Sequence, residues 1–177
     1  MRGWRQGGGG AGCAMADEND APYAAKAHII ASAFLGIELQ CARCHDAPYH
    51  STMQEDLYSL AAMLERKSVT VPKSSRVPIA FFENKSRESL IQVTLKPDQK
   101  VLAKWPFTEV TGVADTPQLD KLLPNPSDTR ERLAALLTAP YNKRFAAVPV
   151  NSPWKHLLRP GIVEPVHAWD GAPASHT

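Results

Sequence analysis

Apolar side chains first recur at helical spacing in the stretch that precedes Cys41. The positions that share one face there are Ala27, Ile30, Phe34 and Ile37, with Ala31 and Cys41 extending the stripe. Pro22 suits the first turn of a helix, and Asn19 or Asp20 can serve as its cap. The pattern therefore predicts a helix that begins near Pro22 and runs directly into Cys41.

A second helix is predicted a short distance further along the chain. Thr52 and Glu55 have the spacing of a capping box, in which each side chain bonds to the backbone N–H of the other residue. The apolar residues that follow fall on one face: Leu57, Leu60, Ala61 and Leu64. Polar residues at 65–68 then end this helix.

A third helix is expected after Ser127 or Asp128, either of which can cap it. Its predicted buried face consists of Leu133, Leu136 and Leu137. Residues 145–158 also carry apolar and aromatic side chains at near-helical spacing. Pro149 and Pro153 interrupt that stretch, and because each lacks a backbone donor we expect them to break a helix there.

The hydrophobic period changes to two between the second and third predicted helices. Apolar residues alternate with polar ones at Ile91, Val93 and Leu95. Residues 97–99 offer a turn, and residues 101–105 can return as a second strand. We therefore predict a β-hairpin over residues 89–105, followed by a proline-punctuated connector over residues 106–126.

Prolines are concentrated in the later part of the chain. Of the 15 prolines, two precede residue 71 and 13 follow it. Because proline ends helices, the later part cannot be one compact helical bundle. We predict a mainly α fold with a small β-hairpin segment. We also expect the chain to be an incomplete fragment of two domains, which a proline-rich connector joins.

The same patterns divide the chain into four segments. Residues 1–20 contain a run of glycines and are expected to be disordered. Residues 21–70 form a two-helix segment, and residues 71–126 hold the hairpin and the connector. Residues 127–177 are predicted to begin a second, truncated domain.

Composition and charge exclude several classes of protein. The chain has 177 residues and 44% hydrophobic residues, of which 24 are alanines. A formal net charge of +2 without a block of Lys or Arg argues against binding to nucleic acid. The longest apolar run, residues 29–37, is too short to span a bilayer. No secretory signal peptide is visible.

One motif stands above this background, Cys41-Ala42-Arg43-Cys44-His45. C-x-x-C-H is the spacing used for covalent haem attachment. Cys41 and Cys44 can each form a thioether to a haem vinyl group, and His45 is then carried under the ring as the proximal iron ligand. By average residue usage the pentapeptide arises in on the order of one chain in a thousand of this length. It predicts haem c as the cofactor.

Other interpretations of the cysteine pair stay open. A thioredoxin-like redox pair would need a βαβ pattern, which is missing here. A structural disulfide turn is a second alternative, and zinc is a third. Zinc would need further ligands from the remaining histidines: His28, His50, His156, His167 and His176. With zinc or a disulfide, the chain would be a non-haem structural or binding module.

Catalysis has weaker support in the sequence. Asp46, Glu55 and Asp56 could act as acid/base carboxylates. Capping explains Glu55, and an exposed helix face explains Asp56. No catalytic constellation accompanies them, so we do not expect an enzyme.

The sixth ligand of a haem iron is less defined. His50 is the nearest downstream histidine, and Met53 and Met63 lie on or beside the second predicted helix. Any of the three is a candidate, and five-coordinate iron is a further alternative. Core filling is the favoured role of Met63, since methionine often fills gaps on a buried helix face.

The residues around the motif resemble a known family. Phe34–Asp46 is similar to the core signature of the planctomycete PSCyt-type, cytochrome-c-like domain of unknown function, and Gln54–Ala62 resembles its continuation into a helix. Several later stretches resemble the opening of the PSD-type domain that follows it in these proteins, such as Arg144-Phe145, Trp154 and Gly161–Val166. Two matches in the correct order make the resemblance specific.

This resemblance carries its own expectations. It implies large, exported, multidomain proteins, often with a further cytochrome module and with sulfatase or carbohydrate-related gene neighbours. The full-length protein would be periplasmic or exported, and its partners would be a redox protein or its own other domains. Ala47 departs from the family, which commonly has a second histidine there. Pro149 and Pro153 depart as well, each at about 3 kcal/mol or more within a helix.

Overall fold

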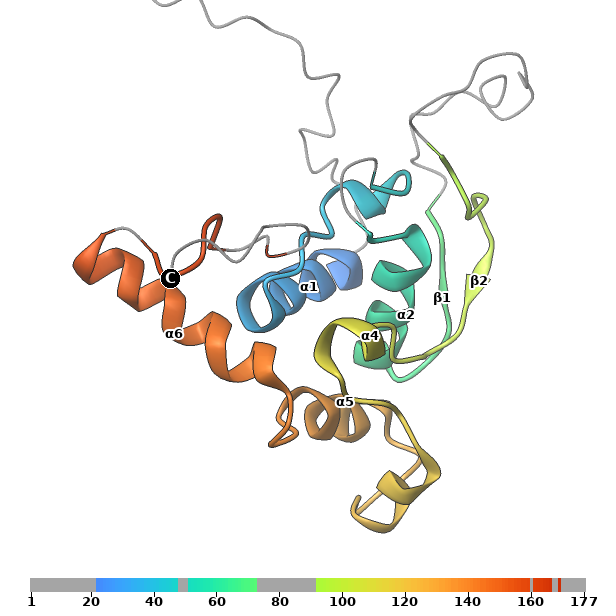
Figure 1. Ribbon diagram of the computed structural model, residues 1–177. Coiled ribbons are helices and arrows are strands. Elements are labelled where there is room, and N and C mark those ends of the chain that lie inside the picture. The colour runs from blue at the N-terminus through green and yellow to red at the C-terminus, as the bar shows by residue number, and fades with distance from the viewer. Residues whose placement is uncertain (1–21, 48–50, 73–91, 160, 167–168, 170–177) are drawn as a thin grey trace, which may run out of the picture.

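The computed structural model describes residues 22–47, 51–72, 92–159, 161–166 and 169 (Figure 1). Its helices are α1 (Pro22–Ile30), α2 (Gln54–Glu65), α4 (Thr108–Thr111), α5 (Thr129–Leu137) and α6 (Lys143–Leu158). The strands β1 (Val69–Thr70) and β2 (Lys100–Val101) pair antiparallel. The prediction of a mainly α fold with a small β part is confirmed.

The chain is helical from Pro22, where the described residues begin, but this helix, α1, does not continue to Cys41. It passes into a π-helical turn, Ala31–Leu35, and ends at Gly36. Gly36 adopts the left-handed conformation with φ 63°, and its N–H donates to the Ser32 carbonyl at 3.3 Å. A residue with positive φ stops a helix. The expectation of one helix running into Cys41 is therefore wrong, and the proposed caps Asn19 and Asp20 lie outside the described residues.

Helix α2 has the predicted buried face but a different start. Leu57, Leu60 and Ala61 are fully buried. Met53, rather than Thr52, holds the cap position, and its N–H donates to Asp56 Oδ2 at 2.7 Å. The predicted Thr52–Glu55 capping box is wrong because the Thr52 hydroxyl instead donates to the Glu38 carbonyl at 3.2 Å.

The small sheet joins segments other than those predicted. Val69 pairs with Val101 and Thr70 with Lys100, so β2 pairs with β1. Residues 73–91 lie outside the described part of the chain, and residues 92–95 form no strand. The predicted hairpin over residues 89–105 is therefore wrong in its pairing. The Thr94 hydroxyl and the Leu95 N–H instead donate to the side chains of Asp46 and Gln54.

Helix α5 matches its prediction closely. Asp128 caps it by accepting the Arg130 N–H at 2.9 Å. The predicted buried face is confirmed at Leu133, Leu136 and Leu137. Arg66, the residue that ends α2, donates to both carboxylate oxygens of Asp128, at 2.9 and 2.7 Å. The Thr129 hydroxyl donates to the Met63 carbonyl at 2.7 Å, so the end of α2 and the start of α5 hold each other.

Asp128 makes this helix contact sensitive to acid. Partial loss of hydration raises its pKa, but hydrogen bonds from Arg130 N–H and from Arg66 outweigh this effect. The pKa of Asp128 therefore lies below its ordinary value of 3.8. A carboxyl whose pKa falls on folding stabilises the fold above its unfolded pKa and loses that contribution as the pH drops through the folded pKa. We expect the stability difference between wild type and Asp128→Asn to shrink below about pH 4.

Asp56→Asn is expected to differ from wild type in the opposite direction as the pH falls. The free energy of unfolding of wild type and of both variants is measured with denaturant over a range of pH. Burial is the main reason that the pKa of Asp56 is raised above 3.8, and the charges of Glu55 and Asp46 add to it. A group with a raised pKa stabilises the fold in its protonated form, and this contribution is lost as the pH rises through the folded pKa. Acidification should therefore favour wild type over Asp56→Asn. The same sign for both variants would contradict these pKa directions.

Helix α6 runs without a break through both of its prolines. The prediction that Pro149 and Pro153 end it is wrong. Each proline deletes one helical hydrogen bond, but polar side chains fix the chain before the first proline and between the two. Asn142 caps the helix by accepting Phe145 N–H at 3.2 Å. The buried amide of Asn151 binds both backbone polar groups of Val163, at 2.8 and 3.1 Å.

The buried core is one contiguous cluster that includes residues from α1, α2, the two strands and α5. In Figure 1, α1 and α2 lie at its centre, α5 lies below them, and α6 extends to one side. The division of the chain into two domains stays a prediction. Within the described residues, no helix has the length and apolar character needed to cross a bilayer.

Candidate functional site

The Cys41–His45 motif forms one tight turn. Cys41–Arg43 is a short 3-10 helix that follows the irregular segment after Gly36. The Cys41 carbonyl accepts the N–H groups of both Cys44 and His45, each at 3.2 Å. These bonds hold the two cysteines and the histidine within a single turn of backbone.

This turn has an inner and an outer side. Ala42 is fully buried in the core, where the turn packs against α2. Cys41, Cys44 and His45 are half-buried. Their spacing of i, i+3 and i+4 is the spacing of residues that share a helical face. The turn therefore buries its alanine and leaves both cysteines and the histidine half-buried.

Tyr58 ties the turn to α2. Its side chain is almost completely buried, and its hydroxyl donates to the Arg43 carbonyl at 2.9 Å. Burial raises the pKa of Tyr58 far above its ordinary value, with a further contribution from Cys44. The hydroxyl is therefore a fixed proton donor throughout the ordinary pH range.

Asp46 fixes the other end of the turn. Its carboxylate accepts the Gln54 N–H, at the first position of α2, at 2.8 Å, and the Thr94 hydroxyl at 3.0 Å. Its own N–H donates to the Gln92 carbonyl at 2.8 Å. Gln54 Oε1 in turn accepts the Leu95 N–H at 3.1 Å. These bonds use the polar groups of residues 92–95 that a hairpin would have needed.

The imidazole of His45 has a defined hydrogen-bonding partner. His45 Nδ1 lies 2.8 Å from the Asp46 carbonyl oxygen. Because a carbonyl can only accept, Nδ1 carries the proton, and the neutral ring then has its lone pair on Nε2. A backbone carbonyl bound to Nδ1 is an arrangement that orients histidines for metal ligation through Nε2. The residues of the turn therefore fit a haem iron ligated by His45.

The other sequence candidates lie in varied surroundings. Met63 is 1% exposed, which is consistent with the core role expected for it. Met53 is 54% exposed at the start of α2. His50 lies outside the described residues. His28, a candidate zinc ligand, lies beside Glu38, with Nδ1 3.3 Å from Oε1.

Two of the nearby carboxylates have structural roles. Asp46 and Asp56 both accept backbone N–H groups at the start of α2, whereas Glu55 is exposed. The hydrogen bonds of Asp46 and Tyr58 that hold the turn were not predicted from the sequence. Asp46 gives no local capping signal in the sequence. The two groups that its carboxylate accepts, the Gln54 N–H and the Thr94 hydroxyl, lie 8 and 48 residues away.

Removing the Tyr58 hydroxyl is expected to loosen the turn. Tyr58→Phe leaves the Arg43 carbonyl without this buried donor, so we expect a loss of about 1 kcal/mol in the free energy of unfolding, measured with urea. Tyr23→Phe is the matched control, since Tyr23 also donates to a carbonyl, that of Thr70, at 2.7 Å, but at a more exposed position. An equal loss in the two variants would contradict a special role for Tyr58.

Comparison with known families gives one match to this region. Residues 10–68 match the family model PSCyt2, a protein of unknown function (DUF1549). This similarity covers α1, the Cys41–His45 turn and α2. No curated protein and no solved structure matches the chain. The similarity of later residues to a PSD-type domain stays a prediction, as does the planctomycete origin.

Proposed function

We propose that Cys41–His45 is a haem c attachment site. Cys41 and Cys44 would each hold the haem through a thioether, formed by addition of the S–H across one haem vinyl group, and His45 would ligate the iron through Nε2. The observation that carries the proposal is the hydrogen bond from His45 Nδ1 to the Asp46 carbonyl, at 2.8 Å. It supports ligation because it orients the ring and leaves Nε2 with the lone pair.

Haem agrees better than zinc with the arrangement of the described side chains; His50, His167 and His176 lie outside them. A structural zinc needs four ligands that converge on one point. Among the described residues, no group of three or more His, Cys, Asp or Glu side chains is placed to hold a metal ion. Haem attachment needs no such convergence, because the sulfurs bond to the edge of the ring and only the imidazole reaches the iron.

The proposed role is electron transfer. A bound haem would supply one-electron exchange at its iron. The protein would contribute the fixed His45 ring, and the buried Ala42 and Tyr58 would hold the turn rigidly against α2. Outer hydrogen bonds of this kind tune the properties of a bound iron. In the full-length protein we expect an exported location, and a redox protein or neighbouring domains as partners.

The proposal is tested by making the protein where haem can be attached. The chain is exported with an added signal peptide in a host that expresses a c-type maturation system. We expect a purified protein with a Soret band and with no titratable thiols at Cys41 and Cys44. Bound zinc with no porphyrin would overturn the proposal in favour of a non-haem structural module.

A further inference from the structure

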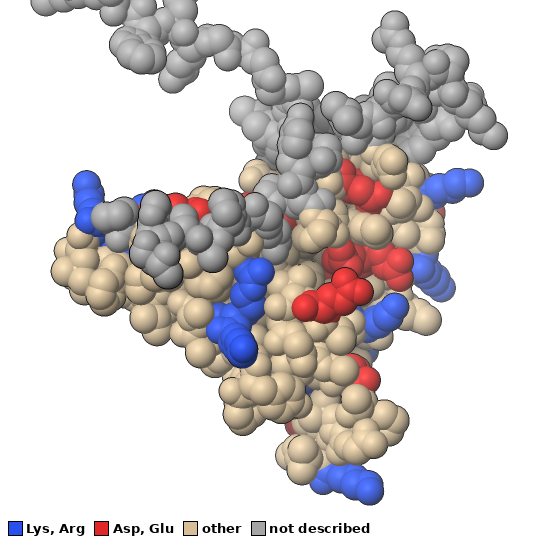
Figure 2. Space-filling model, viewed as in Figure 1, with Lys and Arg blue, Asp and Glu red and all other residues tan. Residues whose placement is uncertain are grey.

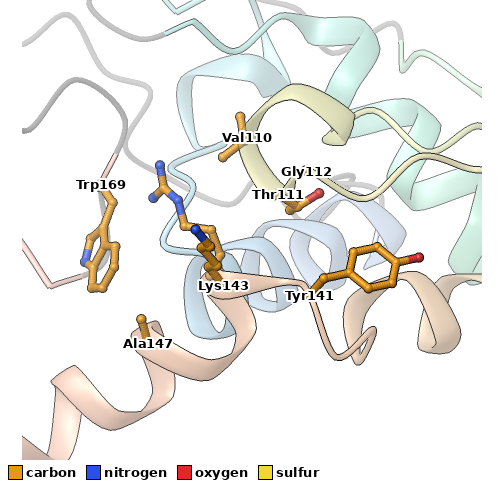
Figure 3. Close-up of a pocket in the computed structure, with 8 residues that line it drawn as sticks. Val110, Thr111, Gly112, Tyr141, Lys143, Ala147 and Trp169 are labelled. Carbon is orange, nitrogen blue, oxygen red and sulfur yellow. The ribbon is translucent and has the colours of Figure 1, made fainter.

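A second candidate site lies away from the Cys41–His45 turn, in a hollow between α4 and α6 (Figure 3). Its volume is about 460 Å³, which is within the range of small-molecule sites. Val110 comes from α4, Tyr141 precedes α6, and Lys143 and Ala147 lie on α6. Trp169 lies on the side of the hollow opposite Tyr141.

The hollow is positively charged. Lys143 and Arg144 line it, and the eight described residues around it include no Asp or Glu. Both cations occupy the first turn of α6, where the helix dipole adds partial positive charge. Figure 2 shows a group of basic side chains near the start of α6 on this face. The same view shows acidic side chains to the right of this group, so the positive charge belongs to the lining of the hollow itself. That lining favours an anion.

Two of the residues that line the hollow, Arg144 and Trp169, are already held in place by other parts of the chain. The Arg144 guanidinium lies over the Trp169 ring, 5.5 Å from its centroid, and Nη1 donates to the Leu35 carbonyl at 3.4 Å. The Trp169 N–H donates to the Gly36 carbonyl at 2.7 Å, and its indole N–H donates to the Val166 carbonyl at 3.0 Å. A wall held in place in this way lowers the ordering cost of binding.

We propose that this hollow binds a small organic anion in which a carboxylate is carried on a flat ring. The planar guanidinium of Arg144 and the ammonium of Lys143 hold the carboxylate by charge-assisted hydrogen bonds. The flat ring of the ligand packs against the Tyr141 ring, on the side of the hollow opposite the Arg144–Trp169 pair. This site is independent of haem attachment, since it shares no residue with the turn.

Titration calorimetry of the full chain at low ionic strength tests the site with three probes. Benzoate carries its carboxylate on a flat aromatic ring, glucuronate carries it on a puckered sugar ring, and inorganic phosphate supplies charge alone. We expect benzoate to bind more tightly than glucuronate and phosphate, and added salt to weaken its binding.

Two exposed positions give variants that should fold normally. Lys143→Ala removes one cation and should weaken binding about threefold or more. Ala147→Leu fills the hollow and should abolish binding, whereas Lys121→Ala, a change outside the hollow, should leave it unaltered. The absence of benzoate binding would overturn the proposal. Benzoate binding unaffected by Ala147→Leu, or glucuronate or phosphate binding as tight as that of benzoate, would also overturn it.

Discussion

Replacing Cys41 and Cys44 together by alanine is expected to abolish covalent haem attachment completely. Both thioether bonds are lost, and His45 ligation alone leaves a haem that denaturing conditions release. The third cysteine, Cys13, provides the matched control because it lies outside the motif. We expect Cys13→Ala to keep the wild-type amount of bound haem. The measurement is haem absorbance that remains with the polypeptide on a denaturing gel.

The single variants refine this result. Cys41→Ala and Cys44→Ala each leave one thiol, so haem retained by either variant should be held through a single thioether and should show a shifted absorption band. Haem that stays covalently bound in the double variant would place the attachment elsewhere. Loss of haem in Cys13→Ala to the same extent would show that the motif is not the specific site.

Gly36→Ala is expected to cause the largest loss of stability among the glycine substitutions considered. Gly36 has φ 63°, where a side chain is strained by about 1–2 kcal/mol. A Cβ placed there would meet the Trp169 ring at 3.0 Å and the Val148 side chain at 3.1 Å. Strain and overpacking together predict a loss of about 3 kcal/mol in the free energy of unfolding.

Gly112→Ala separates these two effects. Gly112 also has a positive φ, 73°, but a Cβ there would meet nothing within 4 Å. It should therefore show only the strain, about 1 kcal/mol. Both variants are compared with wild type by denaturant unfolding. Equal losses would contradict the close packing of Trp169 and Val148 against Gly36.

The local signals in the sequence predicted several elements well. Asp128 and the leucines of α5 form a helix whose cap and buried face are set within ten residues of chain, and the structure confirms both. The buried face of α2 is confirmed at Leu57, Leu60 and Ala61 for the same reason. Each of these features depends on neighbours a few positions away, which a periodic pattern captures.

The errors arose where a distant partner decided the local conformation. Thr52 does not cap α2, because its hydroxyl donates to the carbonyl of Glu38, fourteen residues earlier. Residues 92–95 do not form the predicted strand, because the Thr94 hydroxyl donates to Asp46 and the Leu95 N–H donates to the Gln54 side chain. In α6, the amide of Asn151 binds Val163, twelve residues later, and helps to fix a helix that its prolines weaken.

The C-x-x-C-H motif specified the candidate site, but its support could not be read from the sequence. The motif alone gave the thiols and the imidazole. It did not give the Tyr58 bond to Arg43 or the two bonds of the Asp46 carboxylate, whose partners lie between 8 and 48 residues away. These contacts fix the turn on α2, which is the condition for a rigid iron ligand.

The mass of the intact polypeptide tests haem attachment most directly. The chain is expressed for export together with a c-type maturation system, and a known c-type cytochrome made in the same cells confirms that the system works. Under denaturing conditions we expect the mass of the chain plus one haem, with the added mass located on the peptide that contains Cys41–His45. The mass of the bare polypeptide, with Cys41 and Cys44 both open to alkylation, would contradict the proposed function.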